Sequence, residues 1–181
     1  LQRKEREMDS SPTTKLPGSV AIDREIQRRL AAGKAFTLCY LDLDQLKAFN
    51  DYYGYAKADG VIHQTGDLIR KAVERHGTPR DFVGHVAGDD FVLVTETELI
   101  RAIADDIIHN FDRLIPLYYH PYDQARGYIE TEDRFGQLRR FGFMSISLAA
   151  VDVAPGSAHN HAQISARAAE LKKKAKAIPG S

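Results

Sequence analysis

Cysteine, a surplus of charge and long apolar runs are all scarce or missing in this chain of 181 residues. The single cysteine, Cys39, excludes a disulfide bond within the chain and is typical of a reducing compartment, so we expect a cytoplasmic location. The 25 lysines and arginines balance 25 aspartates and glutamates, which argues against a nucleic-acid partner, because such a partner normally requires a basic surface. No apolar run approaches the ~20 residues that span a bilayer, so we expect no membrane contact.

The length suits one domain with a short extension. Residues 1–14 are charged and then rich in Ser, Pro and Thr. This composition leaves two interpretations open: the end of a helix from an upstream domain followed by a linker, or a disordered tail. We place the linker at 1–15 and the folded domain at 16–181. Because the chain begins at Leu1 and not at Met, we expect it to be a piece of a longer protein.

Apolar periodicity predicts helices that alternate with strands. Helical spacing occurs over 22–30 (ending at Gly33), 44–53, 58–75, 95–114 and 164–175. Continuous apolar runs predict buried strands at 36–42 and 144–151, and apolar runs around a tight centre predict a β-hairpin over 82–94. We interpret 117–143 as an inserted segment that contains a second hairpin. Helical connections together with a direct hairpin favour an α+β fold, whose central sheet is mixed, mostly antiparallel, and flanked by helices.

Carboxylates stand at the end of one predicted strand and at the tip of the hairpin. Asp42 ends the run at 36–42, and Asp89 and Asp90 lie at the tip. If the two strands are neighbours, Asp42 and Asp89 converge, and two oxygen ligands that face one space favour Mg²⁺ and a phosphate-bearing substrate. Taken alone, the Asp-Leu-Asp run at 42–44 also fits a solvated turn or a helix cap. The lysines at 172–174 are interpreted as the solvated face of the last helix, and Cys39 as a small core residue.

Two motifs, taken together, resemble those of the GGDEF family, the diguanylate cyclases that join two GTP molecules into cyclic di-GMP. The family pattern D-x-D-x-F-K-x-x-N-D-x-x-G-H-x-x-G-D is matched over 42–59 by DLDQLKAFNDYYGYAKAD, and the signature G-G-[D/E]-E-F is matched over 87–91 by AGDDF. The resemblance runs from about residue 16 to 176. It implies a palm-like (ferredoxin-like) core shared with nucleotidyl cyclases, an upstream sensor or receiver domain, and a homodimer in which each domain holds one GTP.

The resemblance also assigns roles to single positions. It implies that Asp42, Asp89 and the carbonyl of Leu43 hold Mg²⁺ or Mn²⁺. It further implies that the backbone at Leu46 and Lys47, where a helix begins, cradles phosphates. The remaining positions that it assigns are the guanine readers Asn50 and Asp59, the signature turn Ala87 and Gly88 beside the substrate, and the triphosphate lysine Lys176. Asp89 and Asp90 are the catalytic positions that it implies, with Asp90 either helping to activate the attacking hydroxyl or holding a second metal ion.

Several positions depart from the family pattern. Ala87 replaces the first signature glycine, and an alanine forced into the left-handed region would cost ~1–2 kcal/mol. Asp90 replaces glutamate, which shortens the side chain by one bond of ~1.5 Å. Thr78 replaces the arginine of the family's R-x-x-D product-inhibition motif, so we do not expect feedback binding there. Two interpretations stay open: a working cyclase, or a degenerate module that binds GTP or a partner and regulates a neighbouring domain.

Overall fold

The computed structural model describes residues 9–133, 135–157 and 160–176, so residues 1–8 of the linker predicted at 1–15 lie outside the described part. Its main strands are β1 (Phe36–Asp44), β2 (Phe82–Ala87), β3 (Asp90–Thr95) and β6 (Ser145–Val153). A smaller pair consists of β4 (Ile129–Glu132) and β5 (Leu138–Phe141). The helices are α2 (Ser19–Ala32), α3 (Leu46–Tyr53), α4 (Tyr55–His76), α5 (Ile100–Leu114), the 3₁₀ helix η1 (Ile115–Tyr118), α6 (Pro121–Arg126) and α7 (His161–Lys176).

The central sheet has the strand order β2-β3-β1-β6, and all of its described neighbours are antiparallel. β1 lies in the middle, because its continuous apolar run is buried on both faces. The predicted α+β class and antiparallel character are confirmed. The parallel pair that a mixed sheet would contain does not occur among the described strands, since β3 and β6 both run opposite to β1.

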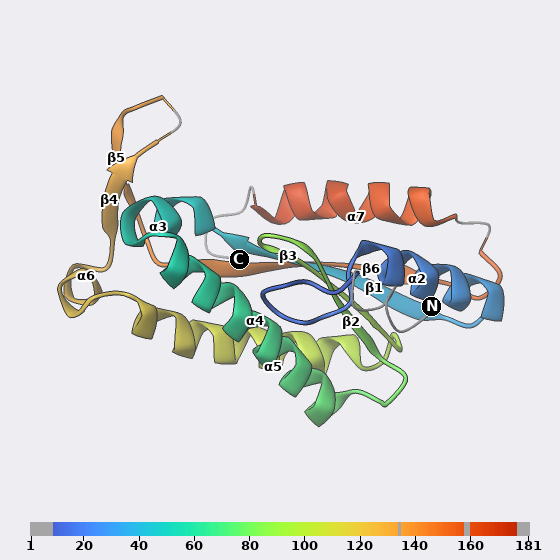
Figure 1. Ribbon diagram of the computed structural model, residues 1–181. Coiled ribbons are helices and arrows are strands. Elements are labelled where there is room, and N and C mark those ends of the chain that lie inside the picture. Colours follow the sequence, from blue (N-terminus) through green and yellow to red (C-terminus); the bar gives the residue numbers. More distant parts are fainter. Residues whose placement is uncertain (1–8, 134, 158–159, 177–181) are drawn as a thin grey trace.

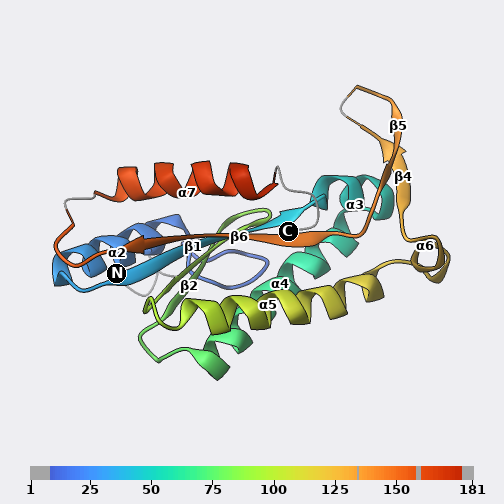
Figure 2. The same ribbon diagram turned by 180° about the vertical axis from the view of Figure 1, so that it is seen from behind.

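The alternation of side chains along the strands divides the core into two layers. Cys39, Leu41 and Leu43 pack with residues of α3, α4 and α5, whereas Phe36 and Leu38 pack with residues of α2 and α7. Figures 1 and 2 show α7 on one side of the sheet and α4 and α5 on the other. Burial raises the pKa of the Cys39 thiol to about 12, as expected for a core residue.

The strands β4 and β5 pair as a separate two-stranded arm that stands out from the domain beside α3, so the second hairpin is confirmed. Its base is fixed by Asp123, which is 2% exposed. This carboxylate accepts hydrogen bonds from the hydroxyls of Tyr52 and Tyr53 and pairs with Arg126 at 2.8 Å. Burial alone would raise the pKa of Asp123, but these three partners outweigh it and lower the pKa.

None of the helices in the described ranges is long and apolar enough to cross a membrane.

Candidate functional site

Three carboxylates meet where β1 ends beside the tip of the β2–β3 hairpin. Asp42 and Asp90 are partners in the β1–β3 register, and the N–H of Leu43 donates to the carbonyl of Asp89 at 3.3 Å. One oxygen each from Asp42, Asp89 and Asp90 lie within 4.8 Å of one another. Asp42 is 3% exposed, and the other two are half-buried. The predicted convergence of positions 42 and 89 is therefore present in the fold.

The tip itself is a two-residue loop, Gly88-Asp89, between the paired residues Ala87 and Asp90. Gly88 has φ +54°, whereas Ala87 and Asp89 are not among the residues with positive φ. Glycine in the first of the two loop positions is the pattern of a type II′ hairpin. The expected left-handed strain at Ala87 is thus absent, because the second glycine of the signature takes the special conformation.

A lysine from α7 completes the cluster. The ammonium group of Lys172 pairs with the carboxylates of Asp42 and Asp90. This contact contradicts the interpretation of residue 172 as part of a solvated face. The missed signal was the spacing: Lys172 follows the buried Ile164 and Ala168 at intervals of four residues, so it continues the stripe that α7 presents to the sheet.

The fold also explains why the partners of Lys172 are these two acids. Asp42 is two residues from Tyr40, and Asp90 is two residues from Val92, so both side chains lie on the face that α7 covers. Burial raises the pKa of Asp90, with a further rise from Asp42, while Lys172 opposes both effects. Burial lowers the pKa of Lys172, but the bonds to the two carboxylates outweigh this effect and raise it.

The acidic cluster fits a hard divalent cation. Its donors are carboxylate oxygens only, which Mg²⁺ and Mn²⁺ prefer over softer metals. The separations within 4.8 Å suit oxygens that share one ion. The carbonyl of Leu43 faces the same hairpin, because a residue in an antiparallel strand directs its N–H and C=O to the same neighbour. Asp44 lies outside this group and instead accepts hydrogen bonds from Ser145 (3.0 Å) and Ser147 on β6.

The start of α3 lies directly after β1. Gln45 precedes the helix with φ +67°, and no side chain in the described part of the protein caps it. The first amides, including those of Leu46 and Lys47, are therefore free of a capping side chain, as a phosphate cradle requires. The Lys47 side chain is 78% exposed and pairs with Asp51, so the structure brings its amide, but not its ammonium group, into this arrangement.

The two predicted base readers lie on successive helices. Asn50, on α3, has a buried Oδ1 with no hydrogen-bond partner among the described residues. Asp59, on α4, is half-buried and accepts a hydrogen bond from the Thr13 hydroxyl at 2.9 Å. A buried acceptor without a donor is costly, so Asn50 is suited to receive an N–H from a ligand. Lys176 is the last residue of α7, and its side chain lies outside the described part.

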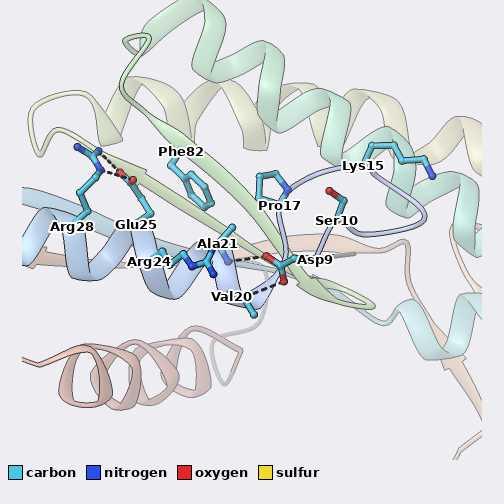
Figure 3. Close-up of a pocket in the computed structure, with 10 residues that line it drawn as sticks. All are labelled: Asp9, Ser10, Lys15, Pro17, Val20, Ala21, Arg24, Glu25, Arg28 and Phe82. Carbon is cyan, nitrogen blue, oxygen red and sulfur yellow. Dashed lines mark hydrogen bonds and ion pairs between the residues drawn. The ribbon is translucent and has the colours of Figure 1, made fainter. Parts of the chain in front are cut away.

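A hollow of about 810 Å³ lies elsewhere, between the segment before α2, α2 itself and Phe82 of β2 (Figure 3). None of the three clustered carboxylates lines it. Asp9 lines it and caps α2 through bonds to the N–H groups of Val20 and Ala21 (Figure 3). Within the described part of the chain, the cluster of Asp42, Asp89 and Asp90 and this hollow are therefore separate features.

Comparison with known proteins decides the family. The family model described as "Diguanylate cyclase, GGDEF domain" matches residues 9–128. The chain belongs to the GGDEF family. The match begins within the segment assigned to the linker, and the division at residue 15 stays a prediction.

Relatives of this GGDEF domain include much longer proteins. The bifunctional diguanylate cyclase/cyclic di-GMP phosphodiesterase MucR of Pseudomonas aeruginosa is 32% identical over 127 residues, which cover 68% of this chain and 17% of MucR. The probable diguanylate cyclase DgcT of Escherichia coli is 32% identical over 92 residues, 49% of this chain and 20% of DgcT. The chain therefore spans a fifth or less of these two relatives.

Solved structures confirm the palm-like fold. The GGDEF domain of DgcB from Caulobacter crescentus in complex with c-di-GMP superposes with a TM-score of 0.64 at 18% identity, covering 93% of this chain and 90% of that one. The Vibrio cholerae LapD S helix-GGDEF-EAL structure gives 0.72 at 14% identity, covering 99% and 37%. At these identities the likeness shows the fold alone. The family and its named relatives place this GGDEF domain among those of bacterial cyclic di-GMP signalling.

Proposed function

We propose that this GGDEF domain binds GTP with Mg²⁺ or Mn²⁺ and, as a homodimer, condenses two GTP molecules into cyclic di-GMP and pyrophosphate. The observation that carries the proposal is the meeting of Asp42, Asp89 and Asp90 at the end of β1. With one lysine beside three carboxylates, the cluster keeps a negative charge that suits a divalent cation. The proposal depends on the family for the identity of the nucleotide and on this cluster for its chemistry.

In the proposed reaction the 3′-hydroxyl of one GTP attacks the α-phosphorus of the other. A new oxygen–phosphorus bond forms while the bond to pyrophosphate breaks, and the hydroxyl proton leaves. The step occurs twice to close the ring. Because each domain holds one nucleotide, two domains must meet face to face, and catalysis consists mainly of positioning and charge neutralisation. A divalent cation held by Asp42 and Asp89, together with the carbonyl of Leu43, supplies part of that neutralisation when bound.

The residues around the cation site have separable roles in this proposal. Asp90 either accepts the proton of the attacking hydroxyl or helps to hold a metal ion. Burial raises the pKa of Asp90, which favours its role as a proton acceptor. Lys172 adds positive charge beside the triphosphate, and Lys176, to which the resemblance assigns this role, keeps it in the proposal. The α3 amides at Leu46 and Lys47, with the turn at Ala87 and Gly88, line the approach of the phosphates.

Base selectivity is assigned to Asn50 and Asp59. A carboxylate accepts from both N1–H and the exocyclic amine of guanine, and adenine lacks this pair of donors. The buried Oδ1 of Asn50 offers a further acceptor. A site whose buried acceptors stay unpaired with the wrong base discriminates strongly, so ATP is excluded.

The test is incubation of the protein with GTP and Mg²⁺, with pyrophosphate and cyclic dinucleotide measured by chromatography. We expect both products from the wild type and at least a hundredfold less from Asp89→Asn. The matched control is Asp105→Asn, because Asp105 is an exposed aspartate on α5 whose ion pair among the described residues is with Arg101. GTP binding without either product would refute the cyclase and leave a regulatory GTP-binding module. The cytoplasmic location and an upstream sensor or receiver domain are proposed with the function.

A further inference from the structure

Residues 9–17, here called the N-terminal loop, are held to the domain at both ends. Asp9 caps α2 through the N–H groups of Val20 (3.2 Å) and Ala21 (2.8 Å), as Figure 3 shows. At the other end, the carbonyl of Pro17 accepts from the N–H of His85 on β2 at 2.9 Å. The loop therefore lies against the strand that leads into the signature turn.

His85 connects this loop with the turn. Its Nε2 lies 2.9 Å from the carbonyl oxygen of Gly88, and its Nδ1 lies 2.7 Å from the Ser11 hydroxyl and 3.0 Å from the Thr14 hydroxyl. Because a carbonyl oxygen can only accept, Nε2 donates this bond, and Nδ1 is the atom that meets the hydroxyls. The ring is 4% exposed and stacks on Phe91, with 4.4 Å between centroids and 10° between planes.

The turn that His85 holds carries a proposed metal ligand. Two of its carbonyls are fixed: that of Gly88 by His85, and that of Asp89 by the N–H of Leu43. The carboxylate of Asp89 extends from this backbone, so its position depends on both bonds. The bond from the N–H of Leu43 to Asp89 connects the turn to β1. The bond from His85 to Gly88 connects it to the N-terminal loop, because His85 also contacts Ser11 and Thr14.

The same loop reaches the opposite half of the candidate site. Thr13, next to Thr14, donates its hydroxyl hydrogen to Asp59 at 2.9 Å. Thr13 thus contacts the proposed base reader, and Thr14 is connected through His85 to the backbone of Gly88, the residue before the proposed metal ligand. The contacts of Thr13 and Thr14 involve none of the residues that form the ion pairs of the acidic cluster.

We propose that His85 is a positioning residue through which the N-terminal loop sets the place of Asp89, and thereby the affinity of the site for a divalent cation and GTP. The nucleotide part of this inference rests on the proposed function. A domain joined before the loop would act on the site through this connection, because the loop precedes α2, contacts Asp59 directly and is linked to the signature turn through His85.

Three variants separate the contacts of Nδ1 with the loop hydroxyls from the bond of Nε2 to Gly88. A Ser11→Ala/Thr14→Val double variant removes both loop hydroxyls and keeps His85. His85→Asn places an amide near Nδ1 and loses the bond to Gly88, whereas His85→Gln places an amide nitrogen near Nε2 and can still donate to Gly88. The control is Thr37→Val, which removes a buried hydroxyl that bonds to Asp152 (2.6 Å) near the other end of β1.

The first measurement is amide hydrogen exchange over residues 86–91 without ligand. We expect exchange to rise about five- to tenfold in the double variant and in His85→Asn, because each loses a buried hydrogen bond, with a smaller rise in His85→Gln. Thr37→Val should leave these amides unchanged even where it lowers the melting temperature. Unchanged exchange in the double variant and in His85→Asn overturns the inference, whatever the nucleotide does.

The second measurement is affinity for Mn²⁺ and for Mn²⁺–GTP in the same variants. We expect a three- to tenfold loss in the double variant and in His85→Asn, a partial rescue in His85→Gln, and no change in Thr37→Val. Faster exchange with unchanged affinity overturns the positioning role, because the link would then be structural only. If the wild type binds neither Mn²⁺ nor GTP, the proposed function fails, and the exchange result alone decides the inference.

Discussion

Replacing Lys172 by methionine is expected to change the affinities for cation and nucleotide in opposite directions. Methionine keeps the apolar stem on the α7 stripe and removes only the charge. In the described structure the ammonium group lies between Asp42 and Asp90, where it opposes a cation held by the same carboxylates. Without nucleotide, Lys172→Met should therefore bind Mn²⁺ more tightly. With GTP, it should bind the nucleotide more weakly, since the triphosphate loses a positive neighbour.

The size of the effect follows from charge and exposure. Two unit charges about 4 Å apart interact by about 4 kcal/mol at an effective dielectric constant of about 20. The side chains of Lys172 and Asp90 are 23% and 37% exposed, so solvent screening reduces the interaction. We take about 1–2 kcal/mol, which corresponds to a gain of about five- to thirtyfold in Mn²⁺ affinity. The lost charge-assisted contact with phosphate should weaken GTP binding about tenfold.

Electron paramagnetic resonance of free Mn²⁺ measures the first affinity, and a fluorescent GTP analogue measures the second. Lys174→Met is the matched control, because Lys174 lies on the same helix, its side chain is 68% exposed, and its ion pair among the described residues is with Glu170 at 3.1 Å. It should change neither affinity. Weaker or unchanged Mn²⁺ binding in Lys172→Met would refute competition for the carboxylates, and unchanged GTP binding would refute the phosphate role.

Three further predictions concern the base site, the turn and the arm. Asp59→Asn should reduce the preference for GTP over ATP at least tenfold in a competition assay, because an amide cannot accept from both guanine donors. Gly88→Ala should cost about 1–2 kcal/mol, or a fall of roughly 2–8 °C in melting temperature, because φ is +54° there although a Cβ would meet nothing within 4 Å. Ala87→Gly should change stability by less than about 1 kcal/mol, and equal losses at the two positions would contradict the turn assignment. The lowered pKa of Asp123 means that its contribution to stability is full above its unfolded pKa of about 4 and is lost as pH falls through the lower folded pKa. The melting temperature of Asp123→Asn should therefore depend less on pH between 3 and 6 than that of the wild type, and parallel curves would contradict this role.

The positions of Asp42 and Asp89 in the fold could be predicted from local sequence pattern. A strand that ends at Asp42 and a hairpin with Asp89 at its tip are both local features, and β1 and β3 are indeed neighbours. The same reasoning failed for Ala87, because the sequence does not say which of two adjacent residues in a turn takes the positive φ. Local pattern gave no role to Asp123, because its partners Tyr52 and Tyr53 lie about seventy positions earlier in the chain.

The position of Lys172 could be predicted only in part from local sequence pattern, and the rest depended on tertiary packing. The two residues that follow it are lysines, and composition alone predicts a solvated run over 172–174. The four-residue spacing from Ile164 and Ala168 carried a signal, but its meaning depends on which face of the sheet α7 covers. That choice follows from the packing of both layers against β1, which no local pattern contains.

The sequence by itself determined the family, the order of the main strands and helices, and the convergence of Asp42 with Asp89, because these depend on periodicity and on residue types at fixed spacing. Only the tertiary structure decided that Lys172 joins Asp42 and Asp90, and that Ser11 and Thr14 reach Gly88 through His85. The physical reason is distance along the chain. Hydrogen bonds and ion pairs between residues 70 to 130 positions apart form only after the core has packed, and the core is specified by all of its residues together.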